Sequence, residues 1–319
     1  MNVVIPDDYQ NCVPMLEAFA KLADHQVTVY NDTLTDEVQL VDRFKDADAL
    51  VLIRERTPIT ASLLARLPKL KLISQTGGGA SHVDMEACRQ HGVTVLAGTG
   101  SPYAAAELTW GLVLAAMRHI PEEVANLKAQ RWQRTLGTGL KGRTLGVFGY
   151  GKIGQLVARY AEAFEMKVLV WGRDTTRARA VAAGLGVADS QASFFEQSDV
   201  VSLHLRLNPE TQGIVTAGNL ARMKLSALLV NTSRAPLIEE GALEAALKHG
   251  RPGMAAVDVF DHEPVVEHPL LALPNVLATP HLGYVEKDSY ELYFGDAFDN
   301  LVAFDAGQPV RNLAAGETP

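Results

Sequence analysis

The chain has 319 residues, of which 47% are hydrophobic and 21% charged, and its formal net charge is −8. This composition is typical of a globular protein and excludes an intrinsically disordered chain, and the length predicts two domains. The acidic balance excludes a general nucleic-acid-binding protein, which needs a basic face. Because the only cysteines are Cys12 and Cys88, we expect neither a disulfide framework nor a cysteine-based zinc site. We find no charged-then-apolar leader and no apolar run of membrane-spanning length, so we expect a cytoplasmic protein that binds neither a membrane nor a metal.

The first hundred residues alternate short apolar runs with helical patterns. Alternation of this kind is typical of a parallel sheet with helices on both faces. A turn cluster at 98–102 then marks a candidate boundary. The expected strands are 2–5, 26–30, 49–53, 70–74 and 94–96, and the expected helices are 13–23, 36–44, 60–66 and 84–90.

A long helix is predicted at 103–117, and its apolar surface is too wide for a helix that is buried on one side only. We expect it to be buried between domains or between subunits. After a glycine-rich link at 136–142 a second alternating series begins, and a last helix is predicted at 287–306. The second series has expected strands at 144–148, 167–171, 200–205, 228–231, 255–259 and 276–278, and expected helices at 153–165, 220–223 and 239–249.

Residues 149–154 have the pattern G-x-G-x-x-G, between a predicted strand and a predicted helix. In this context the pattern predicts a dinucleotide-binding loop. The first glycine permits the tight turn, the second lets the backbone approach a pyrophosphate, and the third lets helix and strand pack closely. The helix N-terminus then offers free N–H groups to the phosphates. The candidate cofactor-binding residues are Gly149, Tyr150, Gly151, Lys152, Ile153 and Gly154.

The end of the next predicted strand bears on the choice between NAD and NADP. An NAD site usually carries Asp or Glu there, which binds the ribose 2′-hydroxyl. Here Gly172 takes that place and Arg173 follows it, with Arg177 nearby. A guanidinium can bind a 2′-phosphate that an acid would repel. The pair favours NADP over NAD, although Asp174 weakens the signal and Arg173 can also be explained as a solvated surface residue.

Three more segments, 230–234, 258–264 and 279–283, follow predicted strands of the second series. Ligands of open α/β sheets bind at the carboxyl ends of strands, so these segments are expected to meet at one site. Taken singly, a histidine is more often structural and an arginine or glutamate more often a solvated charge.

Taken together, the motifs resemble the D-2-hydroxyacid dehydrogenase family. The resemblance implies an α/β fold of two Rossmann-like, doubly wound parallel-sheet domains with a cleft between them. It implies a substrate domain of residues 1–98 and 284–319 and a dinucleotide-binding domain of residues 99–283. It also implies a homodimer held through the helix at 103–117. The segments that carry the resemblance are 77–84, 106–108, 149–154, 202–204, 230–234, 258–264 and 280–281.

By position in these motifs, the resemblance implies that His281 is the acid/base, Glu263 its partner and Arg234 the residue that holds the substrate. The expected reaction transfers a hydride between NAD(P) and a small 2-keto or 2-hydroxy acid. An imidazolium can supply the proton near neutral pH, and a carboxylate bonded to the ring orients it. A guanidinium can grip the carboxylate and the carbonyl oxygen together.

The resemblance also implies how the ligands are held. Asp258 is expected at the nicotinamide carboxamide, and His204 and Thr232 also at the cofactor. Backbone N–H groups of Gly78 and Gly79 are expected to receive the substrate carboxylate. Arg54 is a candidate for a second anionic or polar group, with an ion pair to Glu55 or another acid as the other explanation. The aromatic residues Tyr284, Tyr290, Tyr293 and Phe294 either line the pocket or belong to the core.

The sequence departs from the family pattern at several places. Ser81 and His82 replace residues that are often Asp and Asn, and Arg206 stands where proline is common. The chain ends soon after the last predicted helix, so a regulatory domain is not expected. The expected substrate is glyoxylate, hydroxypyruvate or a bulkier relative, and the sequence does not choose among these acids. A cofactor-sensing binding protein of the corepressor type is the alternative function; Glu263 argues against formate oxidation, and phosphite oxidation stays possible.

Overall fold

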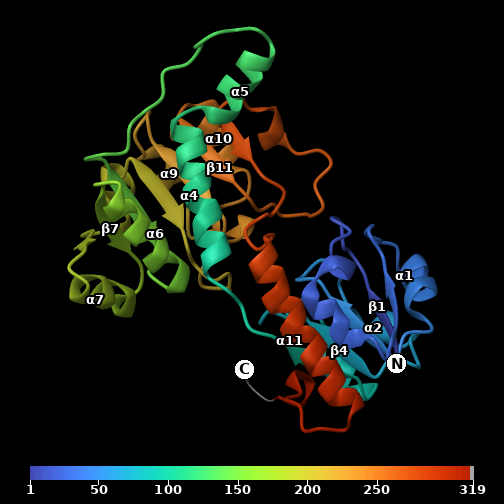
Figure 1. Cartoon of the computed structure of the whole chain (residues 1–319). Helices are drawn as coiled ribbons and strands as arrows, with labels where there is room; N and C mark the ends of the chain where they lie inside the picture. Colours follow the sequence, from blue (N-terminus) through green and yellow to red (C-terminus); the bar gives the residue numbers. More distant parts are fainter. Residues whose placement is uncertain (317–319) are drawn as a thin grey trace. The chain divides into compact units, whose positions relative to one another are not determined.

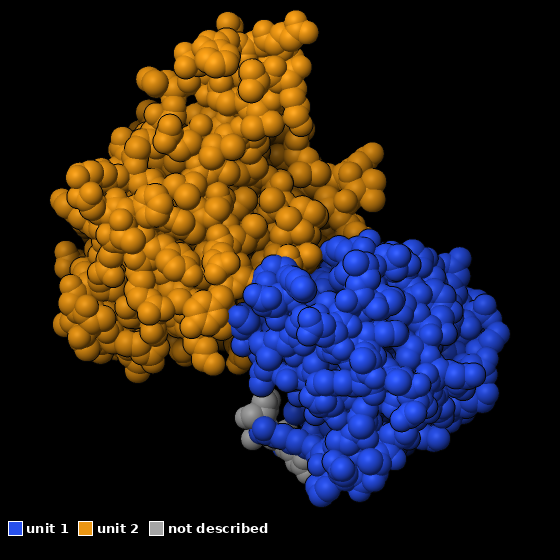
Figure 2. Space-filling view, in the orientation of Figure 1, with its two compact units in different colours: residues 1–101, 286–319 blue, residues 102–285 orange. Residues whose placement is uncertain are grey.

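The structure is a computed structural model that describes residues 1–316, and it divides into two compact units (Figures 1 and 2). The first unit comprises Met1–Ser101 and the C-terminal segment from Glu286, and the second comprises Pro102–Val285. The boundaries lie slightly beyond the expected ones, after residues 98 and 283. The reason is that Thr99 and Ser101 are still hydrogen-bonded to the C-terminal helix of the first unit.

The first unit contains a parallel sheet with the order β2-β1-β3-β4-β5. Each α-helix that connects these strands starts at a side chain, Asp36, Thr60 or Asp84, which accepts the backbone N–H three residues later. The buried face of these helices packs on strand residues such as Leu50 and Ile73. The elements are β1 (Asn2–Ile5), β2 (Gln26–Val29), α1 (Glu37–Phe44), β3 (Ala49–Leu52), α2 (Ala61–Leu64), β4 (Leu72–Gln75), α3 (Met85–Gln90) and β5 (Thr94–Ala97).

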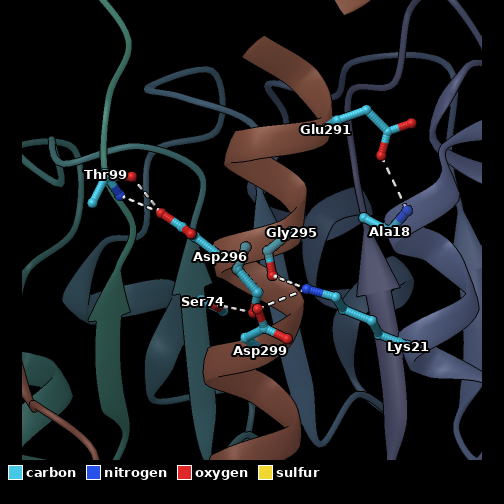
Figure 3. Close-up of polar contacts among 9 residues, drawn as sticks. Ala18, Lys21, Ser74, Thr99, Glu291, Gly295, Asp296 and Asp299 are labelled. Atoms are coloured by element: carbon cyan, nitrogen blue, oxygen red, sulfur yellow. Dashed lines mark hydrogen bonds and ion pairs between the residues drawn. The ribbon is translucent and has the colours of Figure 1, made fainter. Parts of the chain in front are cut away.

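The C-terminal helix α11 (Lys287–Asp305) packs on this sheet, with contacts to β3, β4 and β5. Figure 3 shows the polar contacts along it: Ser74 of β4 donates to the carbonyl of Ala297, and the Thr99 hydroxyl and amide both donate to Asp296. On the other side, Lys21 lies 2.6 Å from Asp299. The helix α11, from the C-terminal segment of the chain, therefore completes the core of the N-terminal unit.

The helix predicted at 13–23 is wrong in type. The segment forms two 3₁₀ helices, η1 (Val13–Met15) and η2 (Glu17–Leu22). Pro14 lies in the first turn of η1 and Leu16 between them is extended, with ψ 142°. The Glu291 carboxylate accepts the amides of residues 17 and 18 and so fixes the start of η2 from another element, which no local pattern reveals.

The second unit contains a seven-stranded parallel sheet with the order β12-β11-β10-β9-β6-β7-β8. Successive strand residues enter two cores: Leu228 and Val230 face one that includes α4 and α6, and Leu229 faces one that includes α8 and α10. Helices therefore cover both faces, as the doubly wound prediction requires. The helices and strands of this unit are α4 (Tyr103–Met117), α5 (Ile120–Lys128), β6 (Thr144–Phe148), α6 (Lys152–Ala163), β7 (Lys167–Trp171), α7 (Asp174–Ala182), β8 (Gly186–Val187), α8 (Gln191–Gln197), β9 (Val200–Leu203), α9 (Ala217–Ala221), β10 (Leu228–Asn231), α10 (Ala242–Lys248), β11 (Met254–Val257) and β12 (Val276–Ala278). Its short 3₁₀ helices are η3 (Ala235–Leu237) and η4 (Pro269–Ala272). A further short 3₁₀ helix, η5 (Leu313–Ala315), belongs to the first unit.

Several elements of this unit differ from the prediction. The sequence did not predict α5, α7, β8 or α8. The helix predicted at 239–249 begins only at Ala242, because Gly241 takes a left-handed conformation, with φ +70°, at its start. The helix predicted at 220–223 begins earlier, since Thr216 and Asn219 form a reciprocal cap. The predicted helix at 103–117 is α4, which packs on α6, β10 and β11 within this unit.

Among the helices of residues 1–316, none is both long enough and apolar enough to cross a membrane.

Candidate active site

The 149–154 loop connects β6 to α6 and contains three glycines that differ in their surroundings. Gly149 has φ +95°, and a Cβ atom there would lie 2.5 Å from the His204 carbonyl oxygen. At Gly154 a Cβ atom would lie 2.2 Å from the carbonyl oxygen of Gly149, so helix and strand can pack only without a side chain. At Gly151 a Cβ atom would meet no atom within 4 Å. The open space is therefore at Gly151, where the α6 N-terminus leaves backbone N–H groups without helical partners.

The loop lies where the strand order of the sheet reverses, between β6 and its neighbour β9. Such a switch point is where doubly wound sheets bind nucleotides. His204 follows β9 at this point, and its Nε2 lies 2.8 Å from the Ser202 hydroxyl. Burial lowers the pKa of His204 to about 4, so the ring is neutral. Its Nδ1 is buried and has no hydrogen-bond partner among residues 1–316.

The segment after β7 contains the residues that bear on the choice between NAD and NADP. A Cβ atom at Gly172 would lie 2.9 Å from the Thr176 methyl group, so an acidic side chain has no ready place there. Arg173 is exposed at the N-cap of α7. Arg177, by contrast, is paired with Asp174 and lies over the Trp171 ring, 4.9 Å from its centroid. Arg173 is thus the arginine of this segment whose side chain extends into solvent.

The two catalytic candidates Glu263 and His281 lie together beyond β11 and β12. Glu263 Oε2 is 2.6 Å from His281 Nδ1, and its Oε1 accepts the backbone N–H of Phe260. His281 has φ +53°, a left-handed conformation that is uncommon for a side-chain-bearing residue and is often found at functional sites. The Tyr284 ring lies edge-on to the imidazole, with the centroids 5.3 Å apart. Nδ1 is therefore held, and Nε2 is the nitrogen that is left for a proton transfer.

Arg234 belongs to the same charged group. Burial favours the neutral form of Glu263, but the His281 hydrogen bond and charge, the Phe260 amide and the Arg234 charge outweigh it, so the pKa of Glu263 is lowered. Asn231 fixes the arginine segment: its Nδ2 donates to the Arg234 carbonyl and its Oδ1 accepts the Ser233 amide. Within the second unit, Glu263 is thus paired with His281 and is close enough to Arg234 for the guanidinium charge to lower its pKa.

Asp258 is fully buried and holds the segment that carries His281. Its Oδ1 accepts the Thr279 hydroxyl at 2.6 Å and the Leu282 amide at 2.7 Å, and its Oδ2 accepts the Gly283 amide at 2.8 Å. Burial raises the pKa of Asp258 against these opposing hydrogen bonds. The carboxylate therefore positions the histidine segment, whatever else it binds.

Thr232 is likewise engaged within the unit. Its hydroxyl lies 2.7 Å from the hydroxyl of Thr109 on α4. Arg206 is exposed on the loop that follows β9.

In the first unit, Arg54 lies beside the loop of residues 77–79, which follows β4. A Cβ atom at Gly77 would be only 2.2 Å from Arg54 Nη1, so the guanidinium covers this glycine. Neither Gly78 nor Gly79 donates its backbone N–H to another atom of residues 1–316. Two adjacent amides and a guanidinium therefore lie at this loop, a combination suited to anions. The Glu55 carboxylate lies at the same loop, since a Cβ atom at Gly79 would be 3.2 Å from Glu55 Oε1.

The neighbouring side chains of this segment have other contacts. Arg56 donates to the Asp7 carbonyl and stacks over the Tyr9 ring at 4.2 Å. Ser81 donates to Glu55 at 2.7 Å. Burial, the largest cause, lowers the pKa of His82 to about 4, and neither nitrogen of this ring has a partner in the described part of the chain. Arg54 is therefore the arginine of this segment that lies at the 77–79 loop.

Within residues 1–316 no group of three or more His, Cys, Asp or Glu side chains is arranged to hold a metal ion.

Comparison with known proteins identifies the family. Residues 110–283 match the model of the D-isomer specific 2-hydroxyacid dehydrogenase, NAD binding domain. The chain belongs to the D-isomer specific 2-hydroxyacid dehydrogenase family. It is 39% identical over 275 residues to the D-3-phosphoglycerate dehydrogenase of Methanocaldococcus jannaschii, with 85% of this chain and 52% of that protein covered. It is 35% identical over 294 residues to the glyoxylate reductase of Aeropyrum pernix, with 87% and 86% covered.

A solved structure is similar over nearly its whole length. The phosphoglycerate oxidoreductase from Vibrio cholerae o395 is 53% identical, with a TM-score of 0.94 and coverage of 96% of this chain and 99% of that one. The chain spans about half the length of the curated phosphoglycerate dehydrogenases that it matches.

In this member of the D-isomer specific 2-hydroxyacid dehydrogenase family, the sequence did not reveal two supporting roles, those of Asn231 and Asp258. Asn231 is the last residue of β10, and its only signal was an Asn at a strand end, a residue type that often forms a local side-chain turn. The contacts of Asp258 with residues 279–283 had no local signal, because they join segments more than twenty residues apart.

Proposed function

We propose that this protein catalyses hydride transfer between NAD(P) and a small 2-keto or 2-hydroxy acid of D configuration. The observation that carries the proposal is the Glu263–His281 contact of 2.6 Å, with the charge of Arg234 acting on the same carboxylate. A histidine with one nitrogen held by a carboxylate is suited to donate or accept a proton through the other. Family membership supports the same reaction class.

In the proposed mechanism the bound nicotinamide cofactor supplies or receives the hydride. His281 gives its Nε2 proton to the substrate carbonyl oxygen during reduction and takes the hydroxyl proton during oxidation. Glu263 stabilises the protonated ring and keeps Nδ1 protonated. Arg234 binds the substrate carboxylate and the carbonyl oxygen, aligning the substrate and countering the negative charge that grows on that oxygen. Asp258 keeps the His281 segment in its left-handed conformation through three hydrogen bonds.

The 149–154 loop fits a dinucleotide, because it leaves open space at Gly151 beside a helix N-terminus. Its residues Gly149 to Gly154 would hold the pyrophosphate, and the segments at His204, Thr232 and Asp258 would hold the remaining parts. Exposed Arg173, together with the absence of an acid at Gly172, favours NADP over NAD. Arg177 is not part of the proposed phosphate site, since it is paired with Asp174.

We propose that the substrate carries a second anionic group. Arg54 covers Gly77, next to the free amides of Gly78 and Gly79. The two amides would bind the substrate carboxylate, and the guanidinium would bind a further anion such as a phosphate. Relatives with the name phosphoglycerate dehydrogenase support this choice, and the relative named glyoxylate reductase supports a substrate without such a group.

We also propose a homodimer. One face of α5 exposes Ile120, Val124 and Leu127 at helical spacing, and the following segment exposes Trp132 and Leu136 by 74% and 93%. Exposed apolar surface of this extent is typical of a subunit interface, and a second copy of the chain is the partner that we propose. A monomer in sedimentation equilibrium would contradict this.

The cytoplasmic location stays a prediction, supported by two cysteines that form no disulfide.

The test is consumption of NADPH and NADH with glyoxylate, hydroxypyruvate, 3-phosphohydroxypyruvate and pyruvate. We expect turnover, with NADPH preferred and the phosphorylated substrate having the lowest KM. Tight cofactor binding without turnover on any of these acids would instead support a cofactor-sensing binding protein.

A further inference from the structure

Tyr293 on α11 contacts two parts of the first unit, the side chain of Arg54 and the backbone of Ser101. The side chain is buried, with only 3% of the residue exposed. Its hydroxyl lies 3.3 Å from the backbone nitrogen and 3.4 Å from the backbone oxygen of Ser101, the last residue of the N-terminal segment. The Arg54 guanidinium carbon lies 5.8 Å from the centroid of the Tyr293 ring, within the range of a cation–π contact.

The backbone of Arg54 is fixed independently of this contact. Arg54 has φ +54°, its backbone N–H donates to the Thr76 hydroxyl at 2.9 Å, and its carbonyl accepts the side-chain Nε2 of Gln75 at 2.7 Å. Both partners are buried. The left-handed backbone directs the side chain over Gly77. With the backbone held at one end and the ring beside the guanidinium at the other, the long side chain has few alternative rotamers.

The 77–79 loop is hydrogen-bonded to the segment of residues 98–101, which also contacts Tyr293. The Gly98 amide donates to the Gly77 carbonyl at 3.1 Å, and Thr99 donates twice to Asp296, one turn along α11 from Tyr293 (Figure 3). The segment of residues 98–101 therefore contacts the loop on one side and α11 on the other. Tyr293 is part of α11 and its hydroxyl is hydrogen-bonded to Ser101, so both elements fix the position of its ring.

We propose that Tyr293 is a positioning residue that holds the Arg54 guanidinium at the 77–79 loop and thereby sets the preference for 2-keto acids with a second anionic group. The inference rests on the proposed role of Arg54. An arginine that is already ordered loses less side-chain freedom on binding an anion, so its contribution to affinity is larger. A substrate that has only the carboxylate gains nothing from this order.

The experiment compares wild type, Tyr293→Phe and Tyr293→Leu for kcat and KM with glyoxylate and 3-phosphohydroxypyruvate. Tyr293→Leu removes the ring and should raise KM for the phosphorylated acid by about three- to tenfold, with KM for glyoxylate and both kcat values within about twofold. Tyr293→Phe keeps the ring and should restore the wild-type ratio of the two KM values. In an Arg54→Gln background, Tyr293→Leu should have no further effect, because the two residues act as one unit.

The control is Phe298→Leu on the same helix. Phe298 is fully buried and its ring contacts Phe19 and Phe294, so its loss should lower Tm without changing the ratio of the two KM values. An equal rise of both KM values in Tyr293→Leu, or an additive effect with Arg54→Gln, would overturn the proposal.

Calorimetric titration of the NADPH-loaded protein with D-3-phosphoglycerate and with glycolate repeats the comparison without turnover, because the reduced cofactor cannot accept a hydride from a hydroxy acid. If wild type binds these acids but does not oxidise them, the proposed function fails, while the ratio of the two Kd values still decides the role of Tyr293. Equal affinity of wild type for both acids would refute the assignment of Arg54 and the proposal that rests on it.

Discussion

Replacing Glu263 with glutamine removes the charge beside His281 while nearly preserving the shape of the side chain. The two side chains are 33% and 25% exposed, and their contact is 2.6 Å long. A hydrogen bond to a charged group contributes about 1.5–3 kcal/mol, and one between neutral groups about 0.5–1.5 kcal/mol. Because solvent reaches both side chains, we take the smaller difference, about 1 kcal/mol, as the loss to the protonated ring. This corresponds to a rate about fivefold lower.

The assay is kcat/KM for keto-acid reduction as a function of pH. The contact with His281 holds the pKa of Glu263 below its usual value, so the carboxylate is charged at neutral pH and loses its charge only in acid. The rate of Glu263→Gln should therefore be about fivefold below wild type at neutral pH, and the difference should shrink as the pH falls through the lowered pKa of Glu263. Asp261→Asn, an exposed acid of the same segment, is the control and should leave the profile unchanged. A difference that is the same at every pH, or an unchanged profile, would contradict this role of Glu263.

Further substitutions test the cofactor and substrate sites. Gly151→Ala should leave Tm near the wild-type value and raise the cofactor Kd by about tenfold or more. Gly154→Ala should lower the free energy of unfolding in urea by about 1–3 kcal/mol. Equal effects of the two substitutions would contradict the different surroundings of these glycines. Arg173→Ala should raise KM for NADPH about tenfold and KM for NADH less than about twofold, with Arg177→Ala as the matched control, and equal changes for the two cofactors would remove the case for NADP. Arg234→Lys should lower kcat/KM about a hundredfold, because an ammonium lacks the fork of donors, and a loss within about threefold would argue against a two-pronged grip.

The fold could be predicted because the buried parallel strands are short, continuous apolar runs such as 228–231, with residues for both cores. The missed helix α7 shows the limit of this signal. Only Ala180 of its residues is buried, so its sequence has no apolar face to detect. The opposite error occurred at 13–23, where an apolar pattern resembled a helix and Pro14 with the extended Leu16 made two 3₁₀ turns.

At the candidate site, strand-end position and motif were enough to predict that Glu263 lies beside His281, and the two are 2.6 Å apart. The catalytic roles of Arg234, Glu263 and His281 stay predictions. The supporting contacts could not be predicted in the same way. Whether Arg54 or Arg56 reaches the 77–79 loop depends on the left-handed backbone at Arg54 and on the Tyr9 ring that holds Arg56. Both depend on tertiary packing, which leaves no periodic pattern in the sequence.

In the proposed reaction a hydride reaches carbon 2 of a keto acid while His281 supplies the proton. The most direct measurement uses NADPH deuterated at the transferable position of its nicotinamide ring, with the product analysed by chiral chromatography and mass spectrometry. We expect deuterium at carbon 2 of a D-hydroxy acid. In His281→Ala we expect a rate lower by about three powers of ten or more, with nearly unchanged cofactor binding. Product without deuterium at carbon 2, product of L configuration, or an undiminished rate in His281→Ala would contradict it.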